Sequence, residues 1–282
     1  MKINCGGLIT NEFNDVLLWQ EADERWQCPG GALVSGGQLP AARLAELVEA
    51  QTGLRVLPIR LVGLYTTAGD TLTLMFRCLQ KGGTRQETQA RFFQLGHLPP
   101  TLDEQQGYML TQASKHPGGT PHWADLRPAH TAGSFTALRT LWHKLQGAPA
   151  MAETTALSPA WEIEVLVMIT TAGGDVVVLA DGDLIALPGG SVKEAEAPWA
   201  AAVRLAQTLA KQAITPQGLS SIYVAPDEPR LTLVFTAVVP DVPSNTATFP
   251  LNQLPQTLPP LHQQALADYV SQERETIFRQ QQ

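Results

Sequence analysis

The sequence is short of cysteine, of long apolar runs and of clustered positive charge. No run approaches the roughly 18 consecutive apolar residues of a membrane span. The three cysteines lack both a disulfide-type and a zinc-type spacing, which favours free thiols in a reducing compartment. The N-terminal residues lack the apolar stretch and cleavage site of a signal peptide. These absences predict a cytoplasmic protein that does not enter a membrane.

Charge is distributed unevenly along the chain. Residues 1–148 contain 13 Lys and Arg against 12 Asp and Glu, whereas residues 149–282 contain 6 against 14. Nucleic-acid-binding domains usually carry a basic face or stripe, so no nucleic-acid partner is expected. An acidic second half also repels polyphosphate unless a metal ion bridges the two.

The chain repeats itself at an interval of 159 residues, and such repeats indicate duplicated units. The segment CPGG at 28–31 matches LPGG at 187–190, and TLMF at 73–76 matches TLVF at 232–235. Flanking matches follow in the same order at nearly the same interval. A length of 282 residues also suits two domains. The repeat therefore predicts a duplicated domain.

The predicted boundaries are a first domain over 1–147, a linker over 148–157 and a second domain over 158–282. The linker is rich in Ala, Thr, Pro and Ser. Just before it, Phe135, Leu138, Leu141 and Trp142 have the spacing of one apolar helix face. That helix could pack on its own domain or form a dimer, so a homo-oligomer stays open.

Both copies have one coarse order of elements. A strand is followed by a Pro-Gly-Gly turn, an Ala-rich helix, further strands and a closing helix, expected over 104–113 and 261–271. Strands interrupted by helices in this way predict an α/β fold. The predicted architecture is two tandem α/β/α sandwich domains with mixed sheets.

A strand, a Pro-Gly-Gly turn and a helix closed by Thr-Gly-Leu resemble the Nudix hydrolase family, whose box is G-x5-E-x7-R-E-U-x-E-E-x-G-U with U apolar. The resemblance implies a glycine loop, here Gly30-Gly31, and helix glutamates that together hold Mg²⁺ or Mn²⁺. In that family the metal bridges the pyrophosphate of a nucleoside-diphosphate-linked substrate, and water attacks phosphorus. Oxygen ligands and shared phosphates suit magnesium, which neutralises charge and activates water.

The first box is incomplete. Counted from Gly31, the box glutamate and arginine fall on Gly37 and Ala45, and two helix glutamates fall on Glu46 and Glu49. Glu46 and Glu49 are therefore candidate catalytic residues and Mg²⁺ or Mn²⁺ ligands. They could equally be solvated helix charges.

A second register is open, because the closing glycine at Gly53 comes one residue late. If Gly53 sets the register, the last two box glutamates fall on Ala50 and Gln51. Glu87, which precedes the next strand, is the candidate for a remote general base. It could also be an ordinary surface acid.

The second box has lost its chelating face. Counted from Gly190, it retains Glu196 and Arg204, which are expected to form a structural ion pair, but Leu205, Thr208 and Leu209 replace the glutamates. No metal is expected in this copy. Because two leucines would form an apolar stripe, its old cleft is predicted to be closed or filled.

One tryptophan and three histidines are also candidate ligand or metal contacts. Trp123 could stack on a base or ribose, although a packing role is the alternative. His116, His122 and His130 are close in sequence, but their spacing fits no common metal motif, which favours a long loop.

Three functions remain open from the sequence. The favoured one is a catalytically weak or inactive Nudix protein that binds a nucleotide-linked ligand or a protein partner, with Gly30, Gly31 and Trp123 as contacts. The alternatives are a metal-dependent pyrophosphohydrolase active in the first domain only, and a scaffold without a small-molecule site. The fold alone does not decide among them.

Overall fold

The computed structural model describes residues 1–34, 37–87, 89–116, 120–127, 159–181, 184–240, 247–251, 253, 255, 257–271 and 276–281. The predicted helix over 135–145, the linker over 148–157 and His130 lie outside the described residues. The domain boundaries and the dimer helix therefore stay predictions. Within the described part of the chain, no helix is long and apolar enough to cross a membrane.

The first half folds into strands and two main helices. The strands are β1 Lys2–Ile9, β2 Val16–Gln20, β3 Trp26–Gln27, β4 Gly30–Ala32, β5 Leu54–Thr67, β6 Thr71–Gly83, β7 Ala90–Phe93 and β8 His122–Asp125. The helices are α1 Pro40–Thr52, the 3-10 turn η1 Leu95–His97 and α2 Glu104–Lys115. The main sheet has the order β4-β1-β6-β5-β8, and a smaller sheet has the order β3-β2-β7.

The second half contains the same kinds of elements. Its strands are β9 Glu162–Thr171, β10 Asp175–Asp181, β11 Leu184–Ala186, β12 Gly189–Ser191, β13 Gly218–Val224, β14 Arg230–Val239, β15 Ala247–Pro250 and β16 Ile277–Gln280. Its helices are α4 Pro198–Leu209 and α5 Pro260–Ser271. The sheet runs β11-β10-β9-β14-β13-β16, with β12 paired to β9 and β15 paired to β10.

The two halves have the same strand order and the same orientations. In the first half, β1 is parallel to β6 and β5 is parallel to β8, whereas β4 and β6 are antiparallel to β1 and β5 respectively. In the second half, β9 is parallel to β14 and β13 is parallel to β16, whereas β12 and β14 are antiparallel to β9 and β13 respectively. The repeat in sequence therefore corresponds to a repeat in topology, and the predicted two-domain α/β fold with mixed sheets is confirmed.

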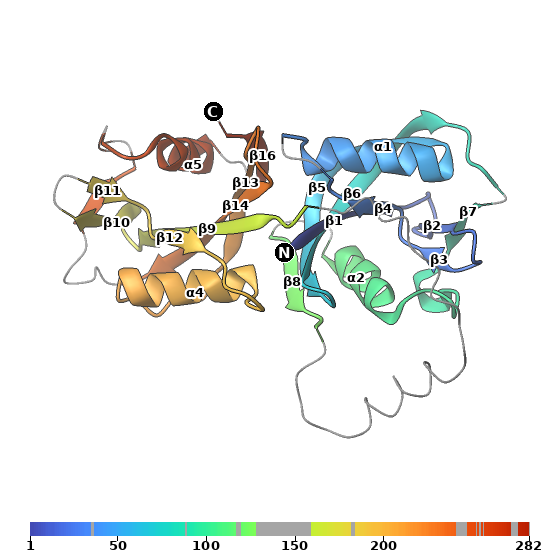
Figure 1. The fold of residues 1–282 in the computed structure, drawn as a ribbon, viewed down its shortest axis with the longest axis horizontal. Helices are drawn as coiled ribbons and strands as arrows, with labels where there is room; N and C mark the ends of the chain where they lie inside the picture. Colours follow the sequence, from blue (N-terminus) through green and yellow to red (C-terminus); the bar gives the residue numbers. More distant parts are fainter. Residues whose placement is uncertain are drawn as a thin grey trace, which may run out of the picture.

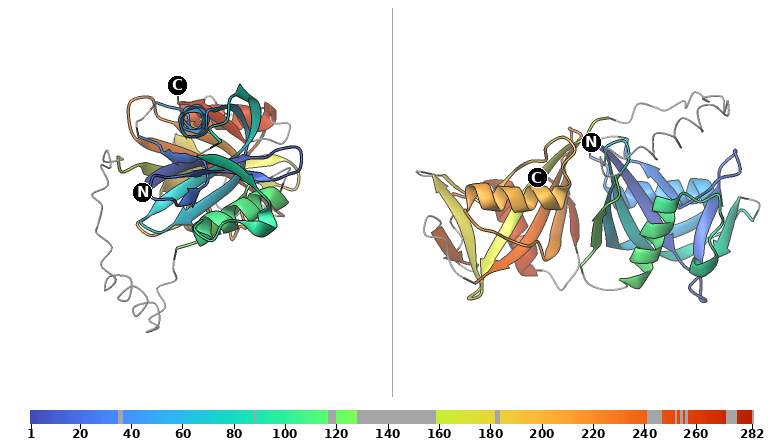
Figure 2. Two further views of the ribbon diagram at one scale, coloured as in Figure 1. Left: turned by 90° about the vertical axis from the view of Figure 1, so that its right-hand side faces the viewer. Right: turned by 90° about the horizontal axis from the view of Figure 1, so that it is seen from below.

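Helices α1 and α4 begin and end with matching signals. Each has a proline in its first turn, Pro40 or Pro198, a position where the missing N–H costs no helix hydrogen bond. A left-handed residue comes after each helix: Gly53, with φ of 74°, directly caps α1, and Lys211, with φ of 54°, follows the α4 cap Ala210. In Figure 1, α1 lies diagonally opposite α4, and α2 lies diagonally opposite α5. The halves are thus related by an approximate two-fold rotation, and they lie side by side in Figure 2.

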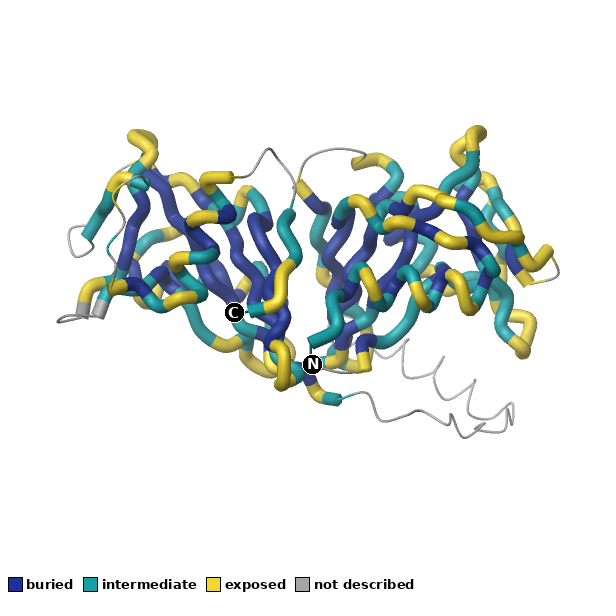
Figure 3. Tube along the Cα trace, turned by 90° about the horizontal axis from the view of Figure 1, so that it is seen from above, coloured by how far each residue is buried: buried dark blue, intermediate teal, exposed yellow. Residues whose placement is uncertain are grey.

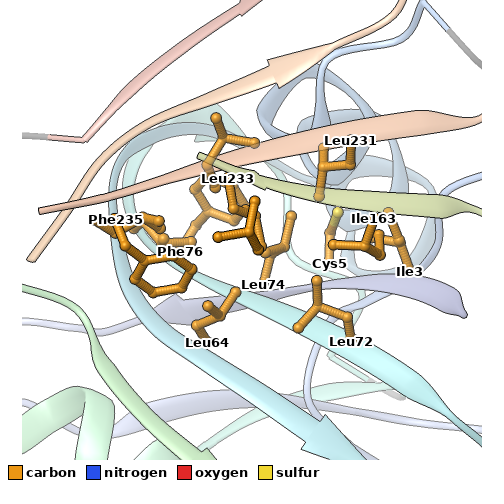
Figure 4. Packing of buried hydrophobic residues seen from close by; sticks show 14 of the residues in the cluster. Ile3, Cys5, Leu64, Leu72, Leu74, Phe76, Ile163, Leu231, Leu233 and Phe235 are labelled. Carbon is orange, nitrogen blue, oxygen red and sulfur yellow. The ribbon is translucent and has the colours of Figure 1, made fainter. Parts of the chain in front are cut away.

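A continuous apolar core joins the two halves. Buried strand residues lie on both sides of the junction (Figure 3). The main sheets contribute equivalent side chains, which Figure 4 shows facing one another: Ile3, Leu72, Leu74 and Phe76 from the first half, and Ile163, Leu231, Leu233 and Phe235 from the second. All eight belong to one cluster with exposures of at most 3%.

Two aromatic pairs repeat each other across the two-fold axis. Phe76 packs on Phe278 with ring centroids 5.1 Å apart, and Phe235 packs on Trp123 at 5.7 Å. Phe76 and Phe235 occupy equivalent positions in β6 and β14. Trp123 and Phe278 occupy equivalent positions in β8 and β16, because they pair with Leu64 and Ile222. Each half therefore places its edge-strand aromatic on the central strand of the other.

Hydrogen bonds to backbone carbonyl oxygens also join the two halves. Trp161 is 2% exposed, and its Nε1 donates to the carbonyl oxygen of Leu33 at 3.2 Å. The backbone nitrogen of Gly37 donates to the carbonyl oxygen of Ala225 at 2.9 Å. Gly37 has φ of 78°, a conformation that glycine adopts without strain. Since donors on both halves are satisfied across the junction, the contact has the character of a protein interior.

Removing one ring from this junction should destabilise both halves together. Phe76→Ala is expected to lower the free energy of unfolding by about 3–5 kcal/mol, the usual range for a buried phenylalanine. Urea denaturation followed by tryptophan fluorescence and by circular dichroism should give one coincident transition. The matched control is Phe13→Ala, because Phe13 is 74% exposed. Two separate transitions in the wild type would contradict a shared core.

Candidate functional site

The register of the box helix is fixed by its contacts with the glycine strand. A methyl group at Gly31 would lie 3.4 Å from Leu47 Cδ1, and one at Gly190 would lie 3.1 Å from Leu205 Cδ2. Leu47 and Leu205 therefore occupy equivalent places over the two glycines. Each is seven residues beyond the helix proline and six before the left-handed residue that comes after the helix.

The equivalence of Leu47 and Leu205 determines which residues of the first half occupy the box positions. The additional residue lies in the loop between Gly31 and Pro40, and the helix itself keeps the register set by Gly53. The box arginine position is then held by Glu46. The three box glutamate positions are held by Leu47, Ala50 and Gln51.

Gln51 replaces a metal ligand with a direct hydrogen-bonded contact. Its Nε2 donates to the carbonyl oxygen of Gly30 at 2.7 Å, and its Oε1 accepts from the backbone nitrogen of Gly30 at 2.9 Å. In the Nudix box a backbone oxygen of this glycine loop is expected to face the metal. Here an uncharged amide bridges helix and loop, and the neighbouring box positions are Leu47 and Ala50. This donor set does not fit Mg²⁺, which prefers carboxylate and water oxygens.

The three candidate acids are directed elsewhere. Glu46 pairs with Arg43 at 3.3 Å and accepts from Gln38 at 2.9 Å. Glu49 is exposed, and Glu87, with a side chain 82% exposed, pairs with Arg85 at 3.4 Å. Among the described residues no three His, Cys, Asp or Glu side chains form a group that could hold a metal. The structure thus does not bring Glu46, Glu49 and Glu87 together.

The second half contains the box ion pair. Arg204 Nε and Arg204 Nη2 each donate to a different oxygen of Glu196 at 2.7 Å. This bidentate pairing and the backbone N–H of Lys193 lower the pKa of Glu196. In the first half the same two positions are held by Gln38 and Glu46. Gln38, on the loop, is uncharged, and its amide donates a hydrogen bond to the Glu46 carboxylate on the helix. Both bonds hold the box loop against its helix.

The two leucines of the second box differ in exposure. Leu205 is 6% exposed and packs over Gly190. Leu209 is 40% exposed, so the predicted covering of both leucines is wrong for Leu209. Leu209 is the last residue of α4, and the Thr208 hydroxyl beside it donates to the carbonyl oxygen of Arg204.

Trp123 and the histidines lie away from the box. Trp123 takes part in the junction through Phe235, which is the packing alternative rather than ligand stacking. His116 and His122 stack on each other at 5.3 Å, beside Tyr108. No described acid or thiol joins them in a metal-binding group.

A cavity of about 180 Å³ lies in the first half, on the α2 side of the main sheet. It extends from Gly30 and Gly31 to the first turn of α2, where Asp103 caps the helix by accepting from the backbone nitrogens of Gln105 and Gln106. Gln106 Oε1 also accepts from the backbone nitrogen of Cys28 at 2.7 Å. Gly30 and Gly31, predicted ligand contacts, therefore line a cavity. Burial raises the pKa of the Cys28 thiol to about 12, so this lining group is neutral.

Comparison with known proteins gives one sequence relative with a Nudix-type description. The chain is 31% identical over 87 residues to a MutT-like protein from Streptomyces ambofaciens, a match that covers 30% of this chain and 56% of the relative. The chain thus spans about half the length of this relative. No family model matches the chain. The Nudix resemblance drawn from the two glycine motifs is supported by this relative.

Solved structures of Nudix proteins are also similar to parts of the chain. An ADP-ribose pyrophosphatase from Streptococcus suis is 24% identical, with a TM-score of 0.37 over 45% of this chain and 98% of that one. A UDP-X diphosphatase is 19% identical, with a TM-score of 0.36 over 44% and 66%. A Nudix hydrolase from Nitrosomonas europaea is 17% identical, with a TM-score of 0.39 over 45% and 78%.

The Gln51 bridge should contribute measurably to stability. Gln51→Ala removes both bonds to Gly30, and we expect it to lower the free energy of unfolding by about 1–3 kcal/mol, the cost of leaving partly buried backbone groups unpaired. Glu49→Ala, an exposed change on the same helix, is the control and should stay within about 0.5 kcal/mol. Equal effects of the two variants, measured by urea denaturation, would show that the bridge adds nothing.

The Glu196–Arg204 pair should give a pH-dependent contribution. Because the folded pKa of Glu196 is lowered, the pair stabilises the fold above the unfolded glutamate pKa of about 4.3, and the contribution disappears as pH falls through the lowered value. Glu196→Gln should therefore cost about 1 kcal/mol at pH 7 and less at pH 3. A cost independent of pH would exclude the ion pair as its source.

Proposed function

We propose that this chain is a Nudix-fold binding protein without appreciable hydrolase activity, and that its ligand occupies the first half. The observation that carries the proposal is the Gln51 bridge to Gly30. Hydrolysis in the Nudix manner needs a metal ion to neutralise the diphosphate and to activate water. With Leu47, Ala50 and Gln51 at the glutamate positions, that ion has no carboxylate ligands from the box helix.

The cavity favours binding over a purely scaffolding role. It is next to the Gly30-Gly31 turn and is lined by polar side chains from β1, β6 and α2. Concave sites with a few converging polar groups are the usual ligand sites of proteins. The alternative, a first-half pyrophosphohydrolase using Glu46, Glu49 and Glu87, requires three acids whose observed partners are Arg43, Gln38 and Arg85 or solvent.

The hydrolysis test uses the full-length protein with Mg²⁺ or Mn²⁺ and ADP-ribose, NADH or a nucleoside triphosphate. Turnover, followed by chromatography of the products, should be far below the about 1–1,000 per second of ordinary enzymes. Any trace rate should be unchanged by Glu46→Gln, Glu49→Gln or Glu87→Gln. Turnover in the ordinary range that falls in Glu46→Gln would overturn the proposal and support the hydrolase alternative.

A further inference from the structure

The cavity in the first half has no cationic side chain in its lining, whereas a phosphate-binding site would need cations. Its lining contains no Lys, Arg or His. The one acid, Asp103, is committed to capping α2. A phosphate placed here would be removed from water without a compensating charge, and such burial is strongly unfavourable. The lining therefore selects against diphosphates.

The second half fills the corresponding place with one of its own side chains. Thr232, which is fully buried, donates to Glu164 at 3.4 Å and accepts from Gln281 Nε2 at 3.0 Å. Gln281 leaves β16 with its backbone nitrogen bonded to the carbonyl oxygen of Val224. A carboxamide of the chain is thus bound at the threonine of the central strand.

The first half has the same threonine without the carboxamide. Thr73 is the equivalent of Thr232, and Asn4 is the equivalent of Glu164, because each pair is matched in the parallel strands. Leu126 is the equivalent of Gln281, since its backbone nitrogen bonds to the carbonyl oxygen of Thr66 in the same way. The residue at this position is therefore apolar in the first half, and it cannot donate a hydrogen bond to Thr73 as Gln281 does to Thr232. Thr73 and Asn4 both line the cavity.

Several polar groups in the cavity are available to a ligand. The side chains of Asn4, Gln27 and Thr73 line the cavity and form none of the hydrogen bonds found among the described residues. Gln105 uses its Nε2 on the carbonyl oxygen of Leu126 at 2.8 Å, which leaves Oε1 as an acceptor. The cavity thus offers donors and acceptors together, the complement of an amide edge.

We propose that this cavity binds a small uncharged molecule with a carboxamide or lactam edge, held by Thr73, Asn4 and Gln105. The inference rests on the proposed binding function, and it specifies a ligand that is not a diphosphate. A volume of about 180 Å³ is below the roughly 300–1,000 Å³ of drug-sized pockets, so the part of the ligand that the cavity holds is of single-ring size.

Benzamide and benzoate test the proposal, because they share shape and differ in charge. Calorimetric titration of the full-length protein should show benzamide binding at least ten times more tightly than benzoate or ADP-ribose. Thr73→Val should weaken benzamide binding about tenfold, the loss expected for one hydrogen bond of about 1.4 kcal/mol. The matched control, Thr232→Val in the second half, should leave it unchanged.

A second variant tests the pseudo-symmetry directly. Leu126→Gln copies the second half and should place the chain's own carboxamide on Thr73, so benzamide binding should fall at least tenfold while the melting temperature is retained. If Thr73→Val does not fold, Leu126→Gln still tests whether Thr73 binds the carboxamide.

The outcomes separate this inference from the function on which it rests. Absence of benzamide binding, or tighter binding of benzoate or ADP-ribose, overturns the carboxamide site. Unchanged benzamide binding in folded Thr73→Val and Leu126→Gln also overturns it. Only rapid metal-dependent hydrolysis overturns the proposed function.

Discussion

The packing of two equivalent sheet faces across an approximate two-fold axis holds the rest of the molecule in place. Phe76 and Phe235 lie near this axis, and each is covered by an aromatic ring from the other half. Burial of apolar surface contributes roughly 25 cal/mol per Å², so a core shared by two sheets couples their stabilities. Because β8 and β16 supply the covering rings, the last strand of each half is held in its sheet by the other half as well as by its own hydrogen bonds.

The two halves share one arrangement of strands and helices but differ in the contacts of their boxes. Both box helices place a leucine over the second glycine, which removes the first carboxylate of a metal site. Beyond that point they diverge. The second half keeps the Glu196–Arg204 pair and holds Thr232 with Gln281. In the first half the uncharged Gln38 donates to Glu46 in place of an ion pair, Gln51 bridges to Gly30, and a cavity lies beside Gly30. Both box helices thus lack carboxylates at their glutamate positions, and in the first half a cavity lies beside the glycine turn.

The sequence predicted the fold because its signals are local and duplicated. Two glycine turns with matching strands on either side specify the order of elements without knowledge of any distant contact. The box register could not be fixed in the same way. A shift of one residue turns a helix by about 100°, and the sequence alone does not locate the additional residue between Gly31 and Pro40. Glu46 was therefore a candidate ligand, although it occupies the arginine position. The roles of Trp123 and Leu126 depend on partners more than 50 residues away, which no local pattern indicates.

The measurement that most directly tests the proposed loss of metal binding is Mn²⁺ titration followed by electron paramagnetic resonance. Wild-type protein should leave the signal of free Mn²⁺ unchanged, because Gln51 is hydrogen-bonded to Gly30 and the box helix has no carboxylate at its three glutamate positions. The triple variant Leu47→Glu, Ala50→Glu, Gln51→Glu restores the three ligands and should reduce the free signal. Micromolar Mn²⁺ binding by the wild type, lost in Glu46→Gln and Glu49→Gln, would contradict the account.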